Sequence, residues 1–268
     1  MIIQEKRVLI TGGSSGIGYA IAEKMLEQGA SVVITGRRAE LVQQASEALK
    51  SISANVHGLV ADVSIAEGRK QTIDGAISAL GGLDILVNNA GGVRAGRLES
   101  MSEDDIRAMI EVDLVAPIML VKSAIPHLKA SGDALVVNVA SGIALVGVPF
   151  YATYAGLKAG LSRFGEALRR ELKGEGIHVM TLYPGATDTP MMQSSKAGPE
   201  LGFVREPASA VAAALIEGIA NDAIDVVRGG EARAKMIALN SENPTAVDER
   251  FLGLKPALEE AVKGHSAL

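Results

Sequence analysis

The chain has 268 residues, a net charge of −5 and no cysteine. Without cysteine it forms neither disulfides nor thiolate metal sites, and an acidic balance with no basic run argues against nucleic acid as a partner. Met1–Arg7 is charged where a signal peptide would be apolar, and no apolar run reaches the ~18 residues of a membrane span. We therefore expect a soluble, cytoplasmic protein that does not associate with a membrane.

Strand-like and helix-like segments alternate along the whole chain, and no linker rich in proline, serine or charge interrupts them. This alternation predicts a single α/β domain over residues 1–268. Residues 189–205 lack periodicity and mix glycine, serine, proline and methionine, which indicates a mobile lid over a substrate. Residues 230–268 are predicted to form a partly helical tail and carry no motif that we can interpret.

The first predicted strand, Val8–Thr11, leads directly into a glycine-rich turn. The turn reads Gly12-Gly13-Ser14-Ser15-Gly16-Ile17-Gly18, and the amphipathic stretch Tyr19–Gln28 follows it. Glycines permit a tight turn and close backbone approach, and the free N–H groups of the next helix favour a pyrophosphate. An ordinary loop between a strand and a helix is the alternative, but this order of elements favours dinucleotide binding.

A second strand is predicted at Ser31–Thr35, followed by Gly36, Arg37 and Arg38 and then by a helix over Ala39–Ser51. In a dinucleotide-binding unit an acid at the end of this strand binds the ribose of NAD, whereas an arginine accommodates the 2′-phosphate of NADP. Arginines occupy the position here and no acid precedes Glu40. The sequence therefore favours NADP, the alternative being that both arginines are solvated residues at a helix start.

Two further strands, Asn55–Val60 and Leu83–Val87, end in polar residues. Ligands of open α/β sheets collect outside the carboxyl ends of the strands. Asp62 after the first of these strands is expected either to meet an adenine or to cap a helix that begins near Ile65. Asn88–Gly92 after the second suits a backbone that passes close to a ligand, although a plain polar turn has the same composition.

A long helix is predicted from the acidic start at Ser102 to Leu128, with Pro117 kinking it or disturbing its hydrogen bonds. The next strand, Ala134–Val139, leads into Ser141. Beyond the helix that starts near Phe150, we predict a strand at Ile177–Leu182, a helix at Ala208–Ala220 and an edge strand at Asp225–Arg228.

Tyr154 and Lys158 lie four residues apart in the helix that starts near Phe150, so their side chains share one face. An ammonium about 4 Å from a phenolate contributes about 4 kcal/mol at an effective dielectric constant near ~20, which lowers the pKa of the phenol towards working pH. A general acid needs such a pKa. Pairs with this spacing also arise by chance, and Tyr151 has no lysine partner, so the pair becomes informative only together with the rest of the chain.

Five short motifs in this order resemble the short-chain dehydrogenase/reductase family, in its compact single-domain branch. They are Thr11-Gly12-x-x-x-Gly16-x-Gly18, Asn88-Asn89-Ala90-Gly91, Ser141, Tyr154-x-x-x-Lys158 and Pro184-Gly185-x-x-x-Thr189. The resemblance spans about residues 6–230, and thirteen positions separate Ser141 from Tyr154. It implies a doubly wound, Rossmann-type sheet of about seven mostly parallel strands with helices on both faces, assembled as a homo-oligomer, either a tetramer or a dimer.

The resemblance also implies hydride transfer between NADP(H) and a carbonyl or secondary alcohol. Tyr154 would be the general acid in reduction and the base in oxidation, Lys158 would lower its pKa and bind the nicotinamide ribose, and Ser141 would polarise the carbonyl oxygen. Ile143, Tyr151 and Met191 are expected to line an apolar substrate pocket. The residues expected to bind the cofactor are Gly12, Ser14, Ser15, Gly16, Ile17, Gly18, Arg37, Arg38, Asp62, Val63, Asn89, Ala90, Gly91, Tyr154, Lys158, Pro184, Gly185, Thr187 and Thr189.

One position departs from the family pattern. The family commonly has asparagine in a Val-Asn-Leu run of the fourth helix, where it supports a water relay behind the lysine, and here the run is Val112-Asp113-Leu114. Our hypothesis is that the relay survives while the added carboxylate perturbs Lys158. A non-catalytic NADP-binding sensor or assembly protein on the same fold is the alternative function. The four histidines are far apart in sequence, so we expect neither a metal site nor a catalytic histidine.

Overall fold

The centre of the molecule is a seven-stranded sheet in which every neighbouring pair of strands is parallel. The computed structural model describes residues 1–268. The strand order is β10-β7-β6-β4-β1-β2-β3, which confirms the predicted doubly wound α/β fold. The strands are β1 (Arg7–Ile10), β2 (Ser31–Gly36), β3 (Val56–Val60), β4 (Ile85–Asn88), β6 (Ala134–Val139), β7 (Ile177–Tyr183) and β10 (Asp225–Val227).

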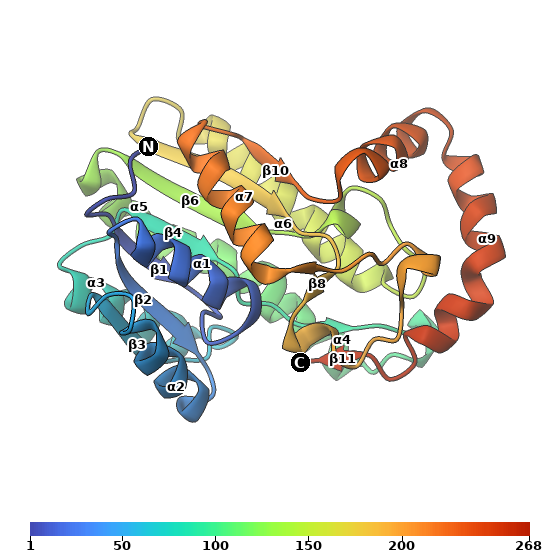
Figure 1. Cartoon of the computed structure of the whole chain (residues 1–268), viewed down its shortest axis with the longest axis horizontal. Helices are drawn as coiled ribbons and strands as arrows, with labels where there is room; N and C mark the ends of the chain where they lie inside the picture. Colours follow the sequence, from blue (N-terminus) through green and yellow to red (C-terminus); the bar gives the residue numbers. More distant parts are fainter.

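Helices cover both faces of the sheet because successive side chains of each strand enter opposite cores. In β1, Val8 and Ile10 belong to one buried cluster and Leu9 to the other. Figure 1 shows the first cluster's helices, α1, α2 and α7, in front of the sheet. Those helices are α1 (Gly16–Glu27), α2 (Ala39–Leu49) and α7 (Ala208–Ala220), and the opposite face carries α3 (Ala66–Leu80), α5 (Ala116–Ser131) and α6 (Ala152–Glu171).

The long helix predicted from Ser102 to Leu128 is divided. It consists of α4 (Glu103–Ile110), a π-helical turn at Glu111–Val115, and α5, which contains Pro117 in its first turn. Pro117 has no N–H, so the α-helical hydrogen bond to the carbonyl of Asp113, four residues earlier, cannot form. The predicted disturbance at Pro117 is confirmed, and it lies beside the residue that departs from the family pattern.

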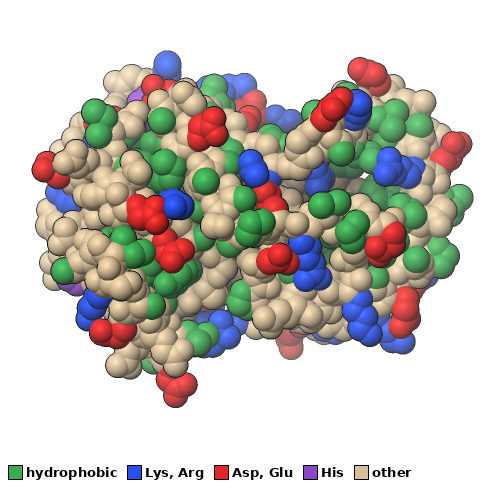
Figure 2. All heavy atoms as spheres, viewed as in Figure 1, with side chains coloured by type: hydrophobic (Ala, Val, Ile, Leu, Met, Phe, Trp, Pro, Cys, Tyr) green, Lys and Arg blue, Asp and Glu red, His purple; other side chains and the backbone are tan.

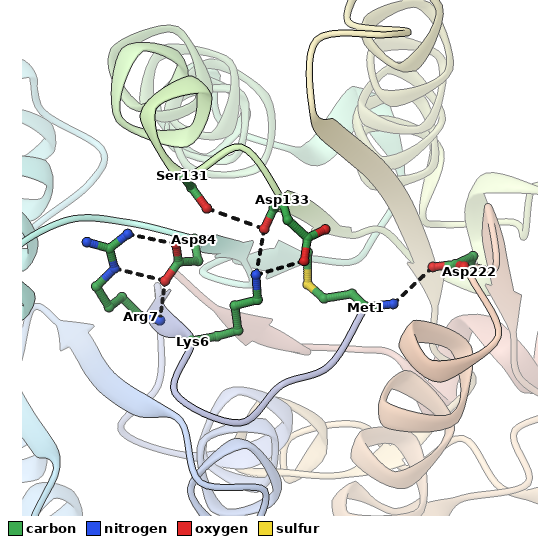
Figure 3. A network of polar contacts seen from close by, with 7 residues as sticks. All are labelled: Met1, Lys6, Arg7, Asp84, Ser131, Asp133 and Asp222. Atoms are coloured by element: carbon green, nitrogen blue, oxygen red, sulfur yellow. Dashed lines mark hydrogen bonds and ion pairs between the residues drawn. The ribbon is translucent and has the colours of Figure 1, made fainter.

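An ion-pair network ties the N-terminus to the amino ends of the central strands, far from the edge that carries the predicted site (Figure 3). Arg7 donates from Nε and Nη2 to the two carboxylate oxygens of Asp84, at 2.8 Å each. Burial opposes the ionisation of Asp84, but hydrogen bonds and charge from Arg7 outweigh it and lower the pKa of Asp84 to about 2. Next to this pair Lys6 contacts Asp133, and the N-terminal ammonium of Met1 contacts Asp222.

Two segments, residues 190–205 and 230–268, lie together beyond the carboxyl edge of the sheet, and we call them the cap. The first has two 3-10 turns, η4 (Pro190–Met192) and η5 (Pro199–Leu201), and is flanked by a ladder between β8 (Thr187–Asp188) and β9 (Glu206–Pro207). The second contains α8 (Gly230–Glu242), α9 (Pro244–Ala261) and β11 (Ser266–Ala267). In Figure 1 α8 and α9 project away from the sheet before the chain returns to β11, near α4.

The second cap segment is held to the rest of the chain mainly through its end. β11 pairs antiparallel with β5 (Val93–Arg94), a short strand that the sequence did not predict. The amide of Lys196 donates to the carbonyl of Ala261 at 2.8 Å, which joins the two cap segments. Glu259 of α9 forms an ion pair with Arg97. No helix in the structure has the length and apolar content needed to cross a membrane.

Candidate active site

A large cavity, with a volume of about 1310 Å³, opens at the carboxyl edge of the sheet and extends under the cap. Strand order reverses between β1 and β4, and such a switch point is where open α/β sheets bind ligands. The segments that follow β1, β2, β4, β6 and β7 all contribute to its wall. Every residue predicted to bind cofactor or substrate lines this cavity except Gly18, and Asp113 lies directly behind the wall.

The glycine-rich turn is shaped for close approach. Gly12 and Gly16 have φ of +65° and +55°, a left-handed region that glycine adopts without strain. A Cβ on Gly18 would lie 2.5 Å from the carbonyl oxygen of Gly12, so α1 packs directly on the turn. The Ser15 side chain does not cap α1, so the first N–H groups of that helix stay free for an anion. The turn therefore fits the pyrophosphate of a dinucleotide.

Asn89 fastens this turn to the end of β4. Its side-chain amide donates to the carbonyls of Thr11 and Gly12, at 2.9 and 3.1 Å. In return the Thr11 hydroxyl accepts from the backbone amides of Asn89 and Ala90, both at 3.0 Å. The side-chain amide of Asn89, which we expected to bind the cofactor, is therefore occupied in bracing the two turns that form the floor of the cavity.

The end of the cavity beyond β2 is lined by Arg37, Arg38, Asp62 and Val63. Both arginines are exposed and neither forms an ion pair. Asp62 accepts from the amide and hydroxyl of Ser64, at 2.9 and 2.7 Å, and does not cap α3, whose N-cap residue is Ile65. The alternative that Asp62 caps the helix is therefore wrong, and the carboxylate stands at the cavity wall.

Ser141, Tyr154 and Lys158 meet at the middle of the cavity. Ser141 follows β6 as predicted, and the amide of Gly142 donates to the carbonyl of Pro184 at 2.8 Å, which joins the loops after β6 and β7. Lys158 is buried, lies 5.7 Å from the centre of the Tyr154 ring and donates to the carbonyl of Val139 at 3.2 Å. The helical spacing of Tyr154 and Lys158 thus places both side chains beside the serine.

Asp113 is the buried counter-ion of Lys158. Its Oδ1 lies 3.0 Å from Lys158 Nζ, and it accepts a hydrogen bond from the amide of Gly92 at 3.3 Å. A Cβ on Gly91 would lie 2.6 Å from the same carboxylate oxygen, so the glycine leaves room for it. The π-helical turn positions Asp113 behind the lysine, and this ion pair is the structural consequence of the departure from the family pattern.

The charges of the site act on one another. Burial lowers the pKa of Lys158, but the charges of Asp113 and Tyr154 and the hydrogen bond to Asp113 together outweigh burial, so the pKa of Lys158 stands above its ordinary value. Burial raises the pKa of Tyr154 and Asp113 raises it further, against the opposing effects of Lys158 and Ser141. Lys158 therefore acts on Tyr154 in the predicted direction, yet the pKa of Tyr154 is raised, because burial is the larger effect.

Beyond Tyr154 the cavity becomes apolar. Tyr151 lies 6.4 Å from Tyr154, 6.2 Å from Phe203 and 6.0 Å from His265, measured between ring centres, and burial raises its pKa to about 12. Ile143 and Met191, which we expected to line a substrate pocket, pack in the same cluster. The loop after β7 contributes the wall next to the glycine turn, through Pro184, Gly185, Thr187 and Thr189.

The cap supplies wall residues that we had not predicted. Buried His265 bonds through Nδ1 to the Ser194 hydroxyl at 2.9 Å, and burial lowers its pKa. This hydrogen bond joins the two cap segments. The structure contains no cluster of three or more His, Cys, Asp or Glu side chains that could hold a metal ion. The other unpredicted wall residues of residues 230–268 are Gly230, Ala232, Arg233, Met236, Arg250, Phe251, Leu254, Ala267 and Leu268.

Comparison with known proteins agrees with this geometry. The family model of short chain dehydrogenases matches residues 6–200, so the chain belongs to the short-chain dehydrogenase/reductase family. It is therefore an oxidoreductase of a family that uses NAD(P) and acts on small carbonyl or alcohol substrates.

Two of the individual relatives are reductases by name, and a third is a dehydrogenase of known structure. A 3-oxoacyl-[acyl-carrier-protein] reductase of Chlamydia pneumoniae is 37% identical over 69% of this chain and 75% of its own length. The ketoacyl reductase HetN of Nostoc is 30% identical over 92% of this chain and 88% of its own. The crystal structure of a short chain dehydrogenase from Burkholderia cenocepacia in complex with NADP has a TM-score of 0.75 at 35% identity, covering 82% of this chain and 91% of that one.

Proposed function

We propose that this protein is an NADP(H)-dependent carbonyl reductase or alcohol dehydrogenase with Tyr154 as its general acid and base. The observation that carries the proposal is the meeting of Ser141, Tyr154 and a buried, doubly held Lys158 in the middle of a cavity whose other end fits a dinucleotide. A non-catalytic NADP-binding protein has a use for Lys158 at the ribose, but not for the two hydroxyl groups of Ser141 and Tyr154 beside it.

The residues divide the reaction between them. The bound nicotinamide supplies or accepts the hydride. In reduction the Tyr154 hydroxyl gives its proton to the carbonyl oxygen, and in oxidation its phenolate takes the proton of the alcohol. The Ser141 hydroxyl donates a hydrogen bond to the same oxygen, where negative charge develops. The ammonium of Lys158 stabilises the phenolate form, while Asp113 and the carbonyl of Val139 hold the ammonium in place.

A preference for NADP is supported by Arg37 and Arg38. Both line the cavity after β2, where neither has a carboxylate partner, and no acid occupies the position that would bind the ribose of NAD. The crystal structure of the relative from Burkholderia cenocepacia is a complex with NADP. Guanidinium groups bind phosphate through charge and a fork of donors, which suits the 2′-phosphate.

The test is the loss of NADPH absorbance over a panel of ketones, aldehydes and quinones, with NADH alongside and with NADP and secondary alcohols in reverse. We expect turnover with at least one apolar carbonyl and a preference for NADPH of about 10- to 100-fold, which Arg37→Ala together with Arg38→Ala lowers to near one. Tight NADPH binding without turnover in either direction would contradict the catalytic proposal. A preference for NADH would contradict the role of the arginines.

We further propose a homo-oligomer, as the family resemblance implies, with α6 in its interface. Gly160 packs on Leu114 of the same chain, but Gly156 faces open space, so a second chain can approach that side of the helix. Light scattering coupled to gel filtration gives the mass. We also propose that the chain folds as one domain, that residues 189–205 open and close as a lid, and that the protein is cytoplasmic.

A further inference from the structure

Arg233 is a charged residue of the cap that contacts the backbone next to the proposed catalytic serine. It stands in the first turn of α8 and lines the cavity. Its Nη1 donates to the carbonyl of Gly142 at 3.3 Å, and a Cβ on Gly142 would lie 2.9 Å from Arg233 Cζ. The guanidinium therefore rests on the backbone that directly follows Ser141.

No carboxylate of this chain neutralises Arg233. Two other arginines of the cavity wall are paired: Arg228 lies 2.6 Å from Glu206, and Arg205 lies 3.9 Å from Asp188. Arg233 forms no ion pair, and burial lowers its pKa without an opposing acidic group. A half-buried cation without a counter-ion is costly, and a ligand carboxylate would satisfy it with two parallel hydrogen bonds.

Apart from Arg233 and a second arginine, the side chains that α8 and α9 contribute to the cavity wall are apolar. They include Met236 of α8 and Phe251 and Leu254 of α9. Arg250 also contributes to this wall, is exposed and forms no ion pair. Figure 2 shows the surface hollowed between the body of the molecule and the projecting cap, with basic side chains at the edge of the hollow. The cap thus presents cations within an apolar wall.

We propose that Arg233 binds the carboxylate of the substrate, with Arg250 as a second cation, so that the substrate is an apolar oxo acid or the corresponding hydroxy acid. This inference deepens the proposed function and rests on it. The single bond to Gly142 engages one of the five N–H donors of the guanidinium, so the remaining donors stay available to a ligand. Attachment of α8 to the loop after β6 is the competing role for Arg233.

Binding without turnover gives the first test. We would titrate the full chain, saturated with NADP, with straight-chain carboxylates from butanoate to decanoate and with the matching primary amides, by calorimetry. We expect at least one carboxylate to bind ten or more times as tightly as its amide, about 10- to 100-fold. Arg233→Met should bring this ratio to near one. Lys235→Met is the matched control, because Lys235 is an exposed cation of the same helix paired with Glu231, and it should leave the ratio unchanged.

Three results would overturn the inference: no carboxylate binds, amides bind as well as carboxylates, or the preference survives Arg233→Met. The affinity of each variant for NADP is measured separately. A weaker affinity for NADP in Arg233→Met would assign the guanidinium to the cofactor and would also overturn the inference.

Turnover separates this inference from the proposed function. We expect Arg233→Met to lower kcat/KM for 3-oxo and 4-oxo acids about 10- to 100-fold while their methyl esters keep the wild-type value. An equal loss for acids and esters would show that Arg233 only attaches α8, against the inference. Wild-type reduction of esters but not of acids would leave the proposed function intact and refute this inference. If no carbonyl is reduced at all the proposed function fails, whatever the calorimetric ratio.

Discussion

The sheet with the loops that follow its strands, which we call the sheet side, and the cap enclose the same cavity. The two parts differ strongly in how they are stabilised. All residues of β4 and β6 are buried, whereas α8 has no buried residue and α9 only Val247 and Leu258. The turns on the sheet side are braced by reciprocal hydrogen bonds between Thr11 and Asn89, while the cap is attached by a two-residue strand and a few side chains. Under the function proposed above, the difference places proton transfer on the most buried elements of the chain and substrate recognition on its least buried ones.

The largest effect should come from the sheet side, at Tyr154. Tyr154→Phe removes the proton donor, so we expect kcat to fall about a thousandfold, equivalent to about 4 kcal/mol, with the affinity for NADPH kept within about threefold. Tyr151→Phe is the matched control, because Tyr151 lines the same cavity but has no lysine partner. Steady-state kinetics and NADPH fluorescence titration measure both. If Tyr151→Phe were the more damaging change, the proton donor would have been assigned to the wrong tyrosine.

Two equally buried leucines test the difference in stability directly. Leu120 of α5 and Leu258 of α9 are each 1% exposed, the first in a core of the sheet and the second in the cap. We expect Leu120→Ala to lower the free energy of global unfolding by about 3 kcal/mol. Leu258→Ala should lower it by less than about 1 kcal/mol, because the cap opens before the sheet, and should instead speed proteolysis within residues 230–268.

Urea unfolding and limited proteolysis distinguish the two variants. Equal losses of global stability in both would mean that the cap and the sheet unfold together. The inference that the cap is less stable than the sheet side would then be wrong.

Lowering the pH should reduce the free energy of unfolding through protonation of Asp84. The pKa of Asp84 is about 2 in the folded chain against an ordinary value of 3.8, so its ionised form stabilises the fold above about pH 4 and this contribution is lost as the pH falls towards 2. We expect Asp84→Asn to cost about 2 kcal/mol at pH 7 and almost nothing near pH 2. Asp133→Asn, which removes the exposed partner of Lys6, should cost less than about 1 kcal/mol at either pH. A cost for Asp84→Asn that does not change with pH would contradict the role of the Arg7 pair.

The sheet side is also the part of the molecule that could be predicted from sequence. Runs such as Ala134–Val139 enter two cores, and their continuous apolar character marks them as buried strands. The glycine turn, and Tyr154 with Lys158, follow from local rules of backbone freedom and helical spacing. The position of Asp113 in the family motif predicts an effect on Lys158. The ion pair between them, however, depends on a π-helical turn that no local sequence pattern predicts.

Such local rules do not predict the structure of the cap. Its second segment has few buried side chains to produce a periodic pattern, and the contacts that define it are distant in sequence. Arg233 and Gly142 are 91 positions apart, and Ser194 and His265 are 71 apart. Only the folded chain shows that residues 230–268 return to line the cavity, and hence that Arg233 and His265 belong to its wall.

The smallest effect we predict concerns the one residue of the sheet side that departs from its family. The Asp113 charge raises the pKa of both Lys158 and Tyr154, so Asp113→Asn should lower both. Because oxidation needs the Tyr154 phenolate and reduction needs the phenol, both pH profiles of kcat/KM should move to lower pH, with less than about a tenfold change at pH 7. Glu111→Gln is the control, since Glu111 lies on the same π-helical turn but is exposed and paired with Arg69, and its profiles should match the wild type. If the profiles of Asp113→Asn also matched the wild type, the charge of the buried carboxylate would have no part in tuning the site.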